Sequence, residues 1–161
     1  MHKPVILIVD DDANDRLLMQ SAFSHIGISD PIYMVSDGTE AIEYLSGTGS
    51  YTDRNRFRFP TLLLLDLKMA KTNGFEFLRI IRNNPNLMVI PTIVFTSSAD
   101  LDDVKNAYLL GANSYMVKAK TFEGLCDQFK FLYGYWMRVQ VPPIDREGHL
   151  LKTRHEGKLS K

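Results

Sequence analysis

Charged and hydroxyl side chains follow several short apolar runs of the chain, at the positions where the predicted strands end. Asp10 and Asp11 follow the first run, and Asp66 follows the third. Thr96 follows the fourth run, and Lys118 follows the last one. In open α/β sheets, ligands bind beyond the carboxyl ends of the strands. We therefore expect these side chains to lie together and to form a site.

Three carboxylates in one place predict a bound divalent cation. Close carboxylates repel one another and raise the pKa of at least one of them unless a cation neutralises the charge. Mg²⁺ prefers oxygen ligands and commonly fills its remaining positions with water and phosphate oxygens. A hydroxyl at Thr96 and an ammonium at Lys118 could hold phosphoryl oxygens, which favours phosphoryl transfer over a passive metal site. Asp66 is the best acceptor, because it stands alone at its strand end.

Each of these residues also has a simpler structural explanation when it is taken alone. The acids at 10–12 could stabilise the N-terminus of the following helix. A lysine after a strand is commonly a surface residue, and a threonine there is commonly a turn residue. Their joint occurrence on strands one, three, four and five of the same predicted sheet favours the chemical explanation.

Short apolar runs predict the strands that position these groups. Runs of this length, rich in Val, Ile and Leu, are typical of strands buried on both faces of a parallel sheet. They are Val5–Val9, Ile32–Val35, Leu62–Leu65, Thr92–Phe95 and Tyr115–Val117. Segments with helical spacing lie between the runs, so the prediction is an α/β domain with helices on both faces of the sheet.

The helices are predicted from the spacing of their apolar residues and from their end signals. Asp100 and Thr121 are expected to cap the last two helices. Gly27 and Gly111 are expected to end the first and the fourth helix. The expected buried faces are Leu18-Ala22-Ile26, Ala41-Ile42-Leu45, Phe75-Leu78-Ile81, Val104-Ala107-Tyr108 and Phe122-Leu125-Phe129-Leu132-Trp136.

The bulk composition excludes several classes of protein. The chain has 161 residues, 45% of them hydrophobic, which suits one domain with a proper core. Lys+Arg and Asp+Glu number 19 each, so no net field attracts nucleic acid or an acidic membrane. The single cysteine, Cys126, is expected to pack in the interior. No apolar run is long enough for a secretory signal or a membrane span, so we expect a cytoplasmic protein.

Four segments together resemble the receiver domain of two-component response regulators. They are Ile-Leu-Ile-Val-Asp-Asp at 6–11, Leu-Leu-Asp-Leu-Lys-Met at 64–69 with Gly74 beyond it, Val-Phe-Thr-Ser at 94–97 and Gly-Ala-Asn-Ser-Tyr-Met-Val-Lys at 111–118. The resemblance covers roughly residues 4–136. It implies a flavodoxin-like (βα)5 three-layer sandwich with the parallel strand order 2-1-3-4-5. It also implies a receiver domain at 1–140, and we expect residues 141–161 to form a flexible tail.

The resemblance further implies the chemistry of the acidic residues. Asp66 is the phosphoacceptor and receives its phosphoryl group from a sensor histidine kinase in a reaction that needs Mg²⁺. Asp11 and Asp66 bind the metal directly, Asp10 mainly through water, and Lys68 through its backbone carbonyl. The protein is then a signalling phosphoacceptor and not a turnover enzyme, apart from assisting its own phosphorylation and slow autodephosphorylation.

By the same resemblance, Thr96 and Lys118 hold the phosphoryl group. Tyr115 is the aromatic residue that turns inward when Thr96 moves toward the phosphate, and the surface formed by helix 4, strand 5 and helix 5 then changes its affinity for partners. Lys68 and Ser98 are the positions expected to tune the lifetime of the phosphorylated state.

A narrower resemblance concerns the segments 46–60 and 131–139. They are similar to the small single-domain regulators that serve bacterial phytochromes, which implies a phytochrome-type kinase and a homodimer formed through the helix 4–strand 5–helix 5 face. The aromatic last helix is equally typical of an ordinary core-packing helix. The long connection at 46–60 carries Arg54, Arg56 and Arg58, and it is either a solvated surface loop or a loop that faces a partner.

The sequence departs from the family pattern at two positions where proline is usual, Ala70 and Ala119. In the family, the peptide bond that follows the lysine is cis. A cis bond to a residue other than proline costs about 3–4 kcal/mol. Either the fold enforces a cis Lys118–Ala119 bond, or the bond is trans and the following loop shifts, which would put the placement of Lys118 in doubt.

Three other functions are weighed against this prediction. A phosphatase of the haloacid-dehalogenase class needs a second acid two residues after its nucleophile, and that position is Lys68 here. A receiver-like module that works without phosphorylation is the main alternative, and the two missing prolines support it. A transcription factor is not expected, because no helix-turn-helix follows the receiver motifs and output should pass through protein contacts. We expect no nucleic acid and no membrane among the partners.

Overall fold

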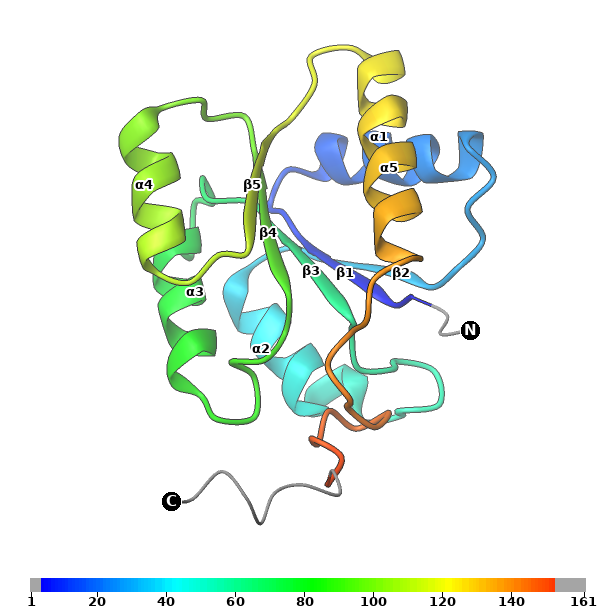
Figure 1. Cartoon of the computed structure of the whole chain (residues 1–161), viewed down its shortest axis with the longest axis vertical. Helices are drawn as coiled ribbons and strands as arrows, with labels where there is room; N and C mark the ends of the chain where they lie inside the picture. Colours follow the sequence, from blue (N-terminus) through cyan, green and yellow to red (C-terminus); the bar gives the residue numbers. More distant parts are fainter. Residues whose placement is uncertain (1–3, 153–161) are drawn as a thin grey trace.

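Five short strands pair in parallel into one sheet, in the order β2-β1-β3-β4-β5 (Figure 1). This computed structural model describes residues 4–152. The strands are β1 (Ile6–Val9), β2 (Ile32–Val35), β3 (Leu62–Leu65), β4 (Thr92–Thr96) and β5 (Ser114–Val117). The strand positions confirm the α/β domain predicted from the apolar runs, and the strand order confirms the flavodoxin-like fold that the receiver resemblance implies.

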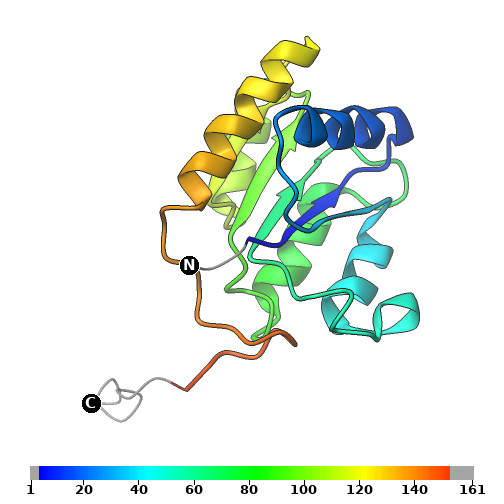
Figure 2. The ribbon, with the colours of Figure 1, turned by 90° about the vertical axis from the view of Figure 1, so that its right-hand side faces the viewer.

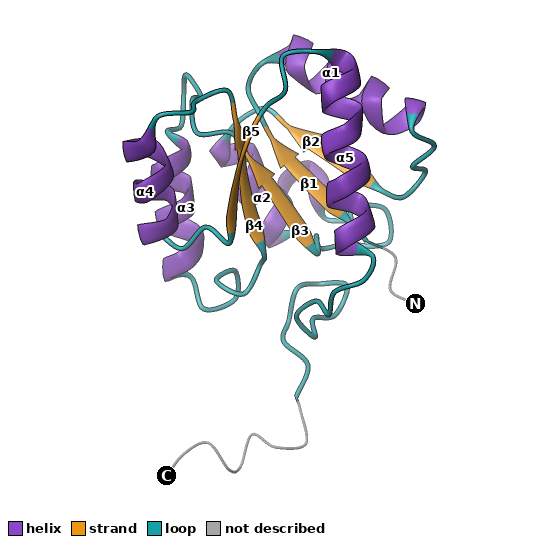
Figure 3. Ribbon diagram, turned by 45° about the horizontal axis from the view of Figure 1, so that its top comes forward, coloured by secondary structure: helices purple, strands orange, loops and turns teal. Residues whose placement is uncertain are grey.

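The helices form two layers, one on each face of the sheet (Figures 2 and 3). They are α1 (Ala13–His25), α2 (Gly38–Ser46), α3 (Gly74–Asn83), α4 (Leu101–Leu109) and α5 (Phe122–Trp136), with a short 3-10 turn η1 (Gly49–Tyr51). Helices α1 and α5 cover one face, and α2, α3 and α4 pack against the other. Right-handed crossovers between neighbouring parallel strands produce this arrangement.

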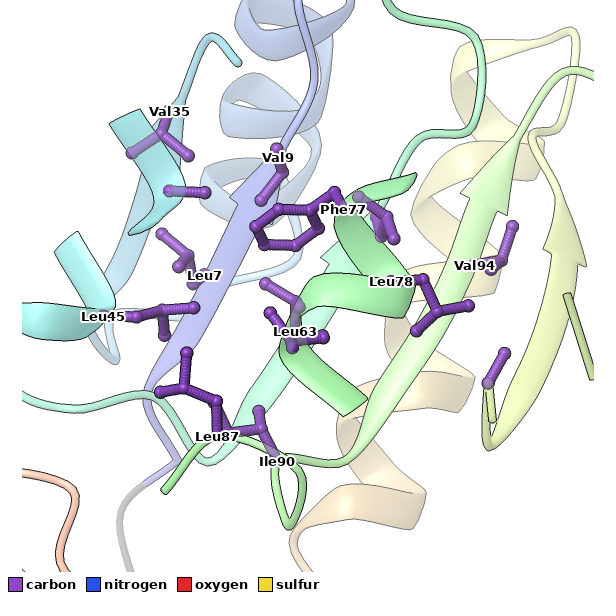
Figure 4. Close-up of a cluster of buried hydrophobic side chains, with 14 of the residues drawn as sticks. Leu7, Val9, Val35, Leu45, Leu63, Phe77, Leu78, Leu87, Ile90 and Val94 are labelled. Atoms are coloured by element: carbon purple, nitrogen blue, oxygen red, sulfur yellow. The ribbon is translucent and has the colours of Figure 1, made fainter. Parts of the chain in front are cut away.

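Alternate residues of each strand supply the two halves of the core. Because successive side chains point to opposite faces, Leu7 and Leu63 face α2 and α3, whereas Ile8 and Leu64 face α1 and α5. Figure 4 shows the first of these clusters, in which Phe77 of α3 lies over the central strands. The three inner strands are buried along their whole length, which rigidly fixes the residues that follow them.

The buried face of the first helix agrees with the prediction in part. Ala22 is buried and Ile26 packs against the core, but Leu18 is 50% exposed and Met19 and Phe23 are buried in its place. Phe23 stacks on Phe129 of α5 with ring centroids 4.0 Å apart, so aromatic packing decides which way the helix turns. The expected caps at Asp100 and Thr121 are present, and the buried Cys126 packs in this second cluster.

Arg54 ties the connection at 46–60 to α2, although several of its residues, among them Thr48, Asn55 and Arg56, are exposed to solvent. The alternative that this loop faces a partner stays a prediction. The guanidinium donates hydrogen bonds to the carbonyls of Tyr44 and Leu45, each at 2.7 Å, and to that of Phe57 at 3.1 Å. Those first two carbonyls belong to the last turn of α2, which a cation stabilises. Tyr44 and Phe57 also pack against each other, so the connection has a small aromatic core.

The segment after α5 folds back onto the domain. The backbone N–H of Phe59 donates to the carbonyl of Arg146 at 3.1 Å, and an isolated antiparallel bridge joins Ile144 to Leu150. Gly148 turns over the Phe59 ring with φ of +95°. The part of the predicted tail up to residue 152 therefore contacts the domain, the flexibility predicted for 141–161 stays a prediction, and residues 153–161 lie outside the described part of the chain.

Candidate functional site

The register of the sheet brings the predicted acids to one edge. Val9 of β1 pairs with Leu65 of β3, so the next residues, Asp10 and Asp66, leave the sheet side by side. Both are buried, with 1% and 8% of their surface exposed. Asp11 offers an oxygen to the same place, and the three carboxylates hold one oxygen each within 4.8 Å of one another.

Lys118 reaches this cluster across the sheet. Its Nζ lies 2.6 Å from Oδ2 of Asp10 and 3.1 Å from Oδ2 of Asp66, and its side chain is 11% exposed. No cis peptide bond occurs in the described residues, so the Lys118–Ala119 bond is trans. The trans bond does not carry the lysine away from the site, because the Lys118 N–H stays paired with the Thr96 carbonyl at 2.8 Å.

A fourth carboxylate, Asp15, belongs to this cluster and was missed from the sequence. Its Oδ2 lies 2.8 Å from Nζ of Lys118, and it comes from the first turn of α1. No sequence signal marked Asp15, because it reaches the site only through the way α1 packs on the sheet. Among the acids at 10–12, Asp12 caps the helix, because its side chain accepts hydrogen bonds from the N–H groups of Asn14 and Asp15.

Burial and charge perturb the titration of the buried pair. Burial raises the pKa of Asp10 above its ordinary value, even though Lys118 and the Asp12 N–H favour its charged form. Burial alone would lower the pKa of Lys118, but the hydrogen bonds to Asp10 and Asp15 outweigh it and raise that pKa. The ammonium is therefore fully charged at neutral pH and partly neutralises a cluster that still holds an excess of acids.

The donor set suits a divalent metal ion such as Mg²⁺. Carboxylate oxygens are the hard ligands that this ion prefers, and an added cation would offset the burial, and to a smaller extent the repulsion by Asp66, that favours a proton on Asp10. The hydroxyl of Thr96 is a second observation that fits. Its Oγ1 is buried and has no hydrogen-bond partner among residues 4–152, as expected of a group kept for a ligand.

The remaining predicted residues lie around Asp66. The backbone N–H of Lys68 donates to Oδ1 of Asp66 at 3.2 Å, while the metal-binding role of the Lys68 carbonyl stays a prediction. The Tyr115 hydroxyl donates to the Ser98 carbonyl at 2.9 Å. Ser98 and Tyr115 thus meet beside the site, and the inward turn expected of Tyr115 stays a prediction.

Comparisons with known proteins agree with this geometry. The family model of the response regulator receiver domain matches residues 6–130. The chain belongs to the response regulator receiver family. As a receiver, it carries its buried acid pair at the carboxyl ends of β1 and β3 and its lysine after β5.

Named relatives of this receiver include regulators linked to phytochromes. The response regulator Rcp1 of Synechocystis sp. is 33% identical over 86% of this chain and 92% of its own length. The Mn²⁺-bound form of Rcp1 matches with a TM-score of 0.74, 33% identity and coverage of 86% of this chain and 99% of that one. The phosphorylated cyanobacterial phytochrome response regulator RcpA matches with a TM-score of 0.78 and 31% identity, over 88% of this chain and 99% of that one.

These matches confirm the predicted family and its resemblance to phytochrome-associated regulators. They place the chain among receivers and not among haloacid-dehalogenase phosphatases, which were weighed because of the strand-end acid. Within residues 4–152, no helix is both long enough and apolar enough to cross a membrane.

Proposed function

We propose that this receiver accepts a phosphoryl group on Asp66 from a histidine kinase, with Mg²⁺ as the cofactor. The observation that carries the proposal is the position of Asp66. Its carboxylate is buried beside two further acids, receives the Lys68 N–H on one oxygen and faces the Lys118 ammonium with the other. A carboxylate fixed at both oxygens is presented as a nucleophile in one orientation.

In the proposed transfer, one Asp66 oxygen attacks the phosphorus of a phosphohistidine. The O–P bond forms as the N–P bond breaks, and the electron pair returns to the imidazole of the kinase. Lys118 would hold a phosphoryl oxygen after loosening its contact with Asp10, and Thr96 would donate its unpaired hydroxyl to another oxygen. A bound Mg²⁺, held by Asp10, Asp11 and Asp66, would supply charge neutralisation for the phosphoryl oxygens.

The test is incubation of the protein with acetyl phosphate and MgCl₂, followed by intact-protein mass spectrometry. We expect one phosphoryl group per chain in the parent and none in Asp66→Asn or in the parent with EDTA. Asp102→Asn, which removes an exposed carboxylate on α4, is the matched control and should be labelled like the parent. A parent that gains no phosphoryl group would favour the receiver-like module that works without phosphorylation, and an Asp66→Asn variant that gains one would show that another residue is the acceptor.

We further propose that the donor is a phytochrome-type kinase and that the reaction takes place in the cytoplasm. The description of one structural match of this chain supports this choice, since RcpA is described as a phytochrome response regulator. A labelled phytochrome kinase that transfers its phosphoryl group to this chain faster than an unrelated labelled kinase would support the proposal. Equal rates would contradict it.

A homodimer through the α4–β5–α5 face is the proposed output. Large apolar side chains are exposed there, among them Leu109 at 74% and Phe131 at 73%. Large apolar side chains that stay exposed on one face are candidates for an interaction site. Sedimentation of the parent and of Phe131→Glu, with and without acetyl phosphate, would test it; a parent that stays monomeric in both states would end the proposal.

A further inference from the structure

One acidic residue beside the site, Asp103, connects the loop after β3 with the loop after β4. It lies in the first turn of α4. The Ser98 hydroxyl donates to its Oδ2 at 2.5 Å, and Nζ of Lys68 lies 3.7 Å from the same oxygen. Ser98 comes from the loop after β4 and Lys68 from the loop after β3, so a single carboxylate oxygen connects them.

The contacts of Asp103 extend from the acceptor to the aromatic residue of β5. On one side, the Lys68 backbone N–H donates to Asp66. On the other side, the Ser98 carbonyl accepts from the Tyr115 hydroxyl. Contacts therefore run without a gap from Asp66 through Lys68, Asp103 and Ser98 to Tyr115, and α4 contributes the middle member.

The two contacts of Asp103 differ in strength, and this difference matters for a switch. Lys68 has 64% of its side chain exposed, so its ion pair with Asp103 is weak and easily exchanged. The Ser98 contact is short and less exposed, because the Asp103 side chain is only 22% exposed. A phosphoryl group on Asp66 would add negative charge near Lys68 and would compete with Asp103 for the ammonium.

We propose that Asp103 is a positioning residue that draws the Lys68 ammonium away from Asp66 and couples the phosphoryl state of Asp66 to the first turn of α4. The proposal rests on the proposed function, since it concerns the acyl phosphate on Asp66. Before phosphorylation, Asp103 holds Lys68 and Ser98 together. After phosphorylation, Lys68 pairs with the phosphoryl oxygens and shields the acyl phosphate from water, and α4 loses its tie to the acceptor loop.

The first test measures the lifetime of the phosphorylated state. Asp103→Asn keeps the size of the side chain and weakens its hold on Lys68, so we expect the acyl phosphate to persist about two- to fivefold longer after acetyl phosphate is removed. Asp102→Asn removes a neighbouring exposed acid whose side chain makes no hydrogen bond or ion pair within residues 4–152, and it should decay like the parent. In a Lys68→Ala background, Asp103→Asn should have no further effect.

Two outcomes of this lifetime measurement would overturn the role of Asp103. The first is an Asp103→Asn variant that decays as fast as Asp102→Asn or faster. The second is an equal lengthening in the presence and in the absence of the Lys68 side chain, because the aspartate would then act without the lysine.

The second test needs neither metal nor phosphoryl group. Amide hydrogen exchange of the segment 98–104, measured with EDTA, should be about two- to fivefold faster in Asp103→Asn than in Asp102→Asn, since the charge-assisted hydrogen bond from the Ser98 hydroxyl to α4 is replaced by a weaker neutral one. Equal exchange would overturn the coupling to α4. If the parent never acquires a phosphoryl group, the proposed function fails, while this measurement still decides whether Asp103 holds the loop.

Discussion

Two regions at opposite ends of the sheet hold charged side chains in opposite ways. At the carboxyl ends of the strands, the Lys118 ammonium is shared by Asp10, Asp15 and Asp66, all of them side chains. At the other end, the Arg54 guanidinium is bound by backbone carbonyls of α2 and of its own loop.

The kind of partner distinguishes a ligand-binding site, at Lys118, from a structural support, at Arg54. Side-chain partners are charged and can exchange one cation for another, so Lys118 can give up a carboxylate to a metal ion and take a phosphoryl oxygen instead. Backbone carbonyls are fixed by the helix and the loop that carry them, and Arg54 has no alternative partner of equal strength. We therefore expect substitutions at the two ends to separate stability from ligand binding.

The largest expected effect is on stability, at Arg54. In Arg54→Ala, the last-turn carbonyls of α2 lose their cation and the aromatic core of the loop loosens, so the free energy of unfolding should fall by about 2–4 kcal/mol. Urea denaturation measures it. Phosphoryl uptake on Asp66 should be unchanged below the transition. Arg56→Ala, an exposed arginine of the same loop, is the control, and an equal loss in both variants would contradict the supporting role of Arg54.

A smaller loss of stability is expected at Lys118, and a ligand should reverse it. In Lys118→Met, the buried acids lose their cation, so unfolding in EDTA should cost about 1–3 kcal/mol less than in the parent. Because a divalent ion can then take the place of the ammonium, the stability gained on adding MgCl₂ should be larger in the variant. Urea denaturation with and without MgCl₂ checks both points, and an equal gain in the two proteins would show that Lys118 and the metal do not compete.

The third effect concerns metal affinity through Asp15. In Asp15→Asn, the Lys118 ammonium turns entirely to Asp10 and Asp66 and competes more strongly with Mg²⁺, so the dissociation constant should rise about two- to fivefold. Calorimetric titration with MgCl₂ measures it. The matched experiment repeats the substitution in Lys118→Met, where it should have little effect. The same loss in both backgrounds would mean that Asp15 acts on the metal directly.

The smallest effect is a pH dependence at the first turn of α2, where Glu40 lies. Burial would raise the pKa of Glu40, but hydrogen bonds from the Ser36 N–H, the Tyr51 hydroxyl and the Ser36 hydroxyl outweigh it, and the pKa lies below its ordinary value of 4.5. The ionised Glu40 therefore stabilises the fold above about pH 4.5, and this contribution is lost as the pH falls through the lowered pKa. Glu40→Gln should be less stable than the parent at neutral pH, and the two should converge in acid.

The control for this comparison is Glu43→Gln, which changes an exposed residue of the same helix. Urea midpoints measured between neutral and acidic pH would follow all three proteins. A constant difference between Glu40→Gln and the parent over that range would contradict the assignment.

Most of the sheet could be predicted because its strands are nearly continuous apolar runs. Ile32–Val35 and Leu62–Leu65 agree with the structure at both ends, and the other strands agree within one residue. Helix faces were harder, because Leu17, Leu18 and Met19 are consecutive and apolar, and spacing alone cannot say which of them turns inward. The stacking of Phe23 on a distant helix decides it, and that contact has no local signal.

At the candidate site, the residues at strand ends could be selected because parallel strands must end at one edge. Asp15 and Asp103 could not, since both come from helices whose orientation depends on packing. The structure of the 46–60 connection could not be predicted from the sequence either. Arg54 finds its partners in carbonyls, and every residue carries a carbonyl, so no sequence pattern marks the contact.

The glycine at 148 predicts which residues should change together among relatives of this chain. Its backbone has a positive φ, and a Cβ there would overlap the ring of Phe59, so no other residue fits without moving the segment. An alignment of relatives would then show which of them keep the contact between residues 148 and 59. Relatives with glycine at 148 should have an aromatic residue at 59, and relatives that lose one of the two should lose the other. The reason is that the close packing of the two residues is what requires each of them.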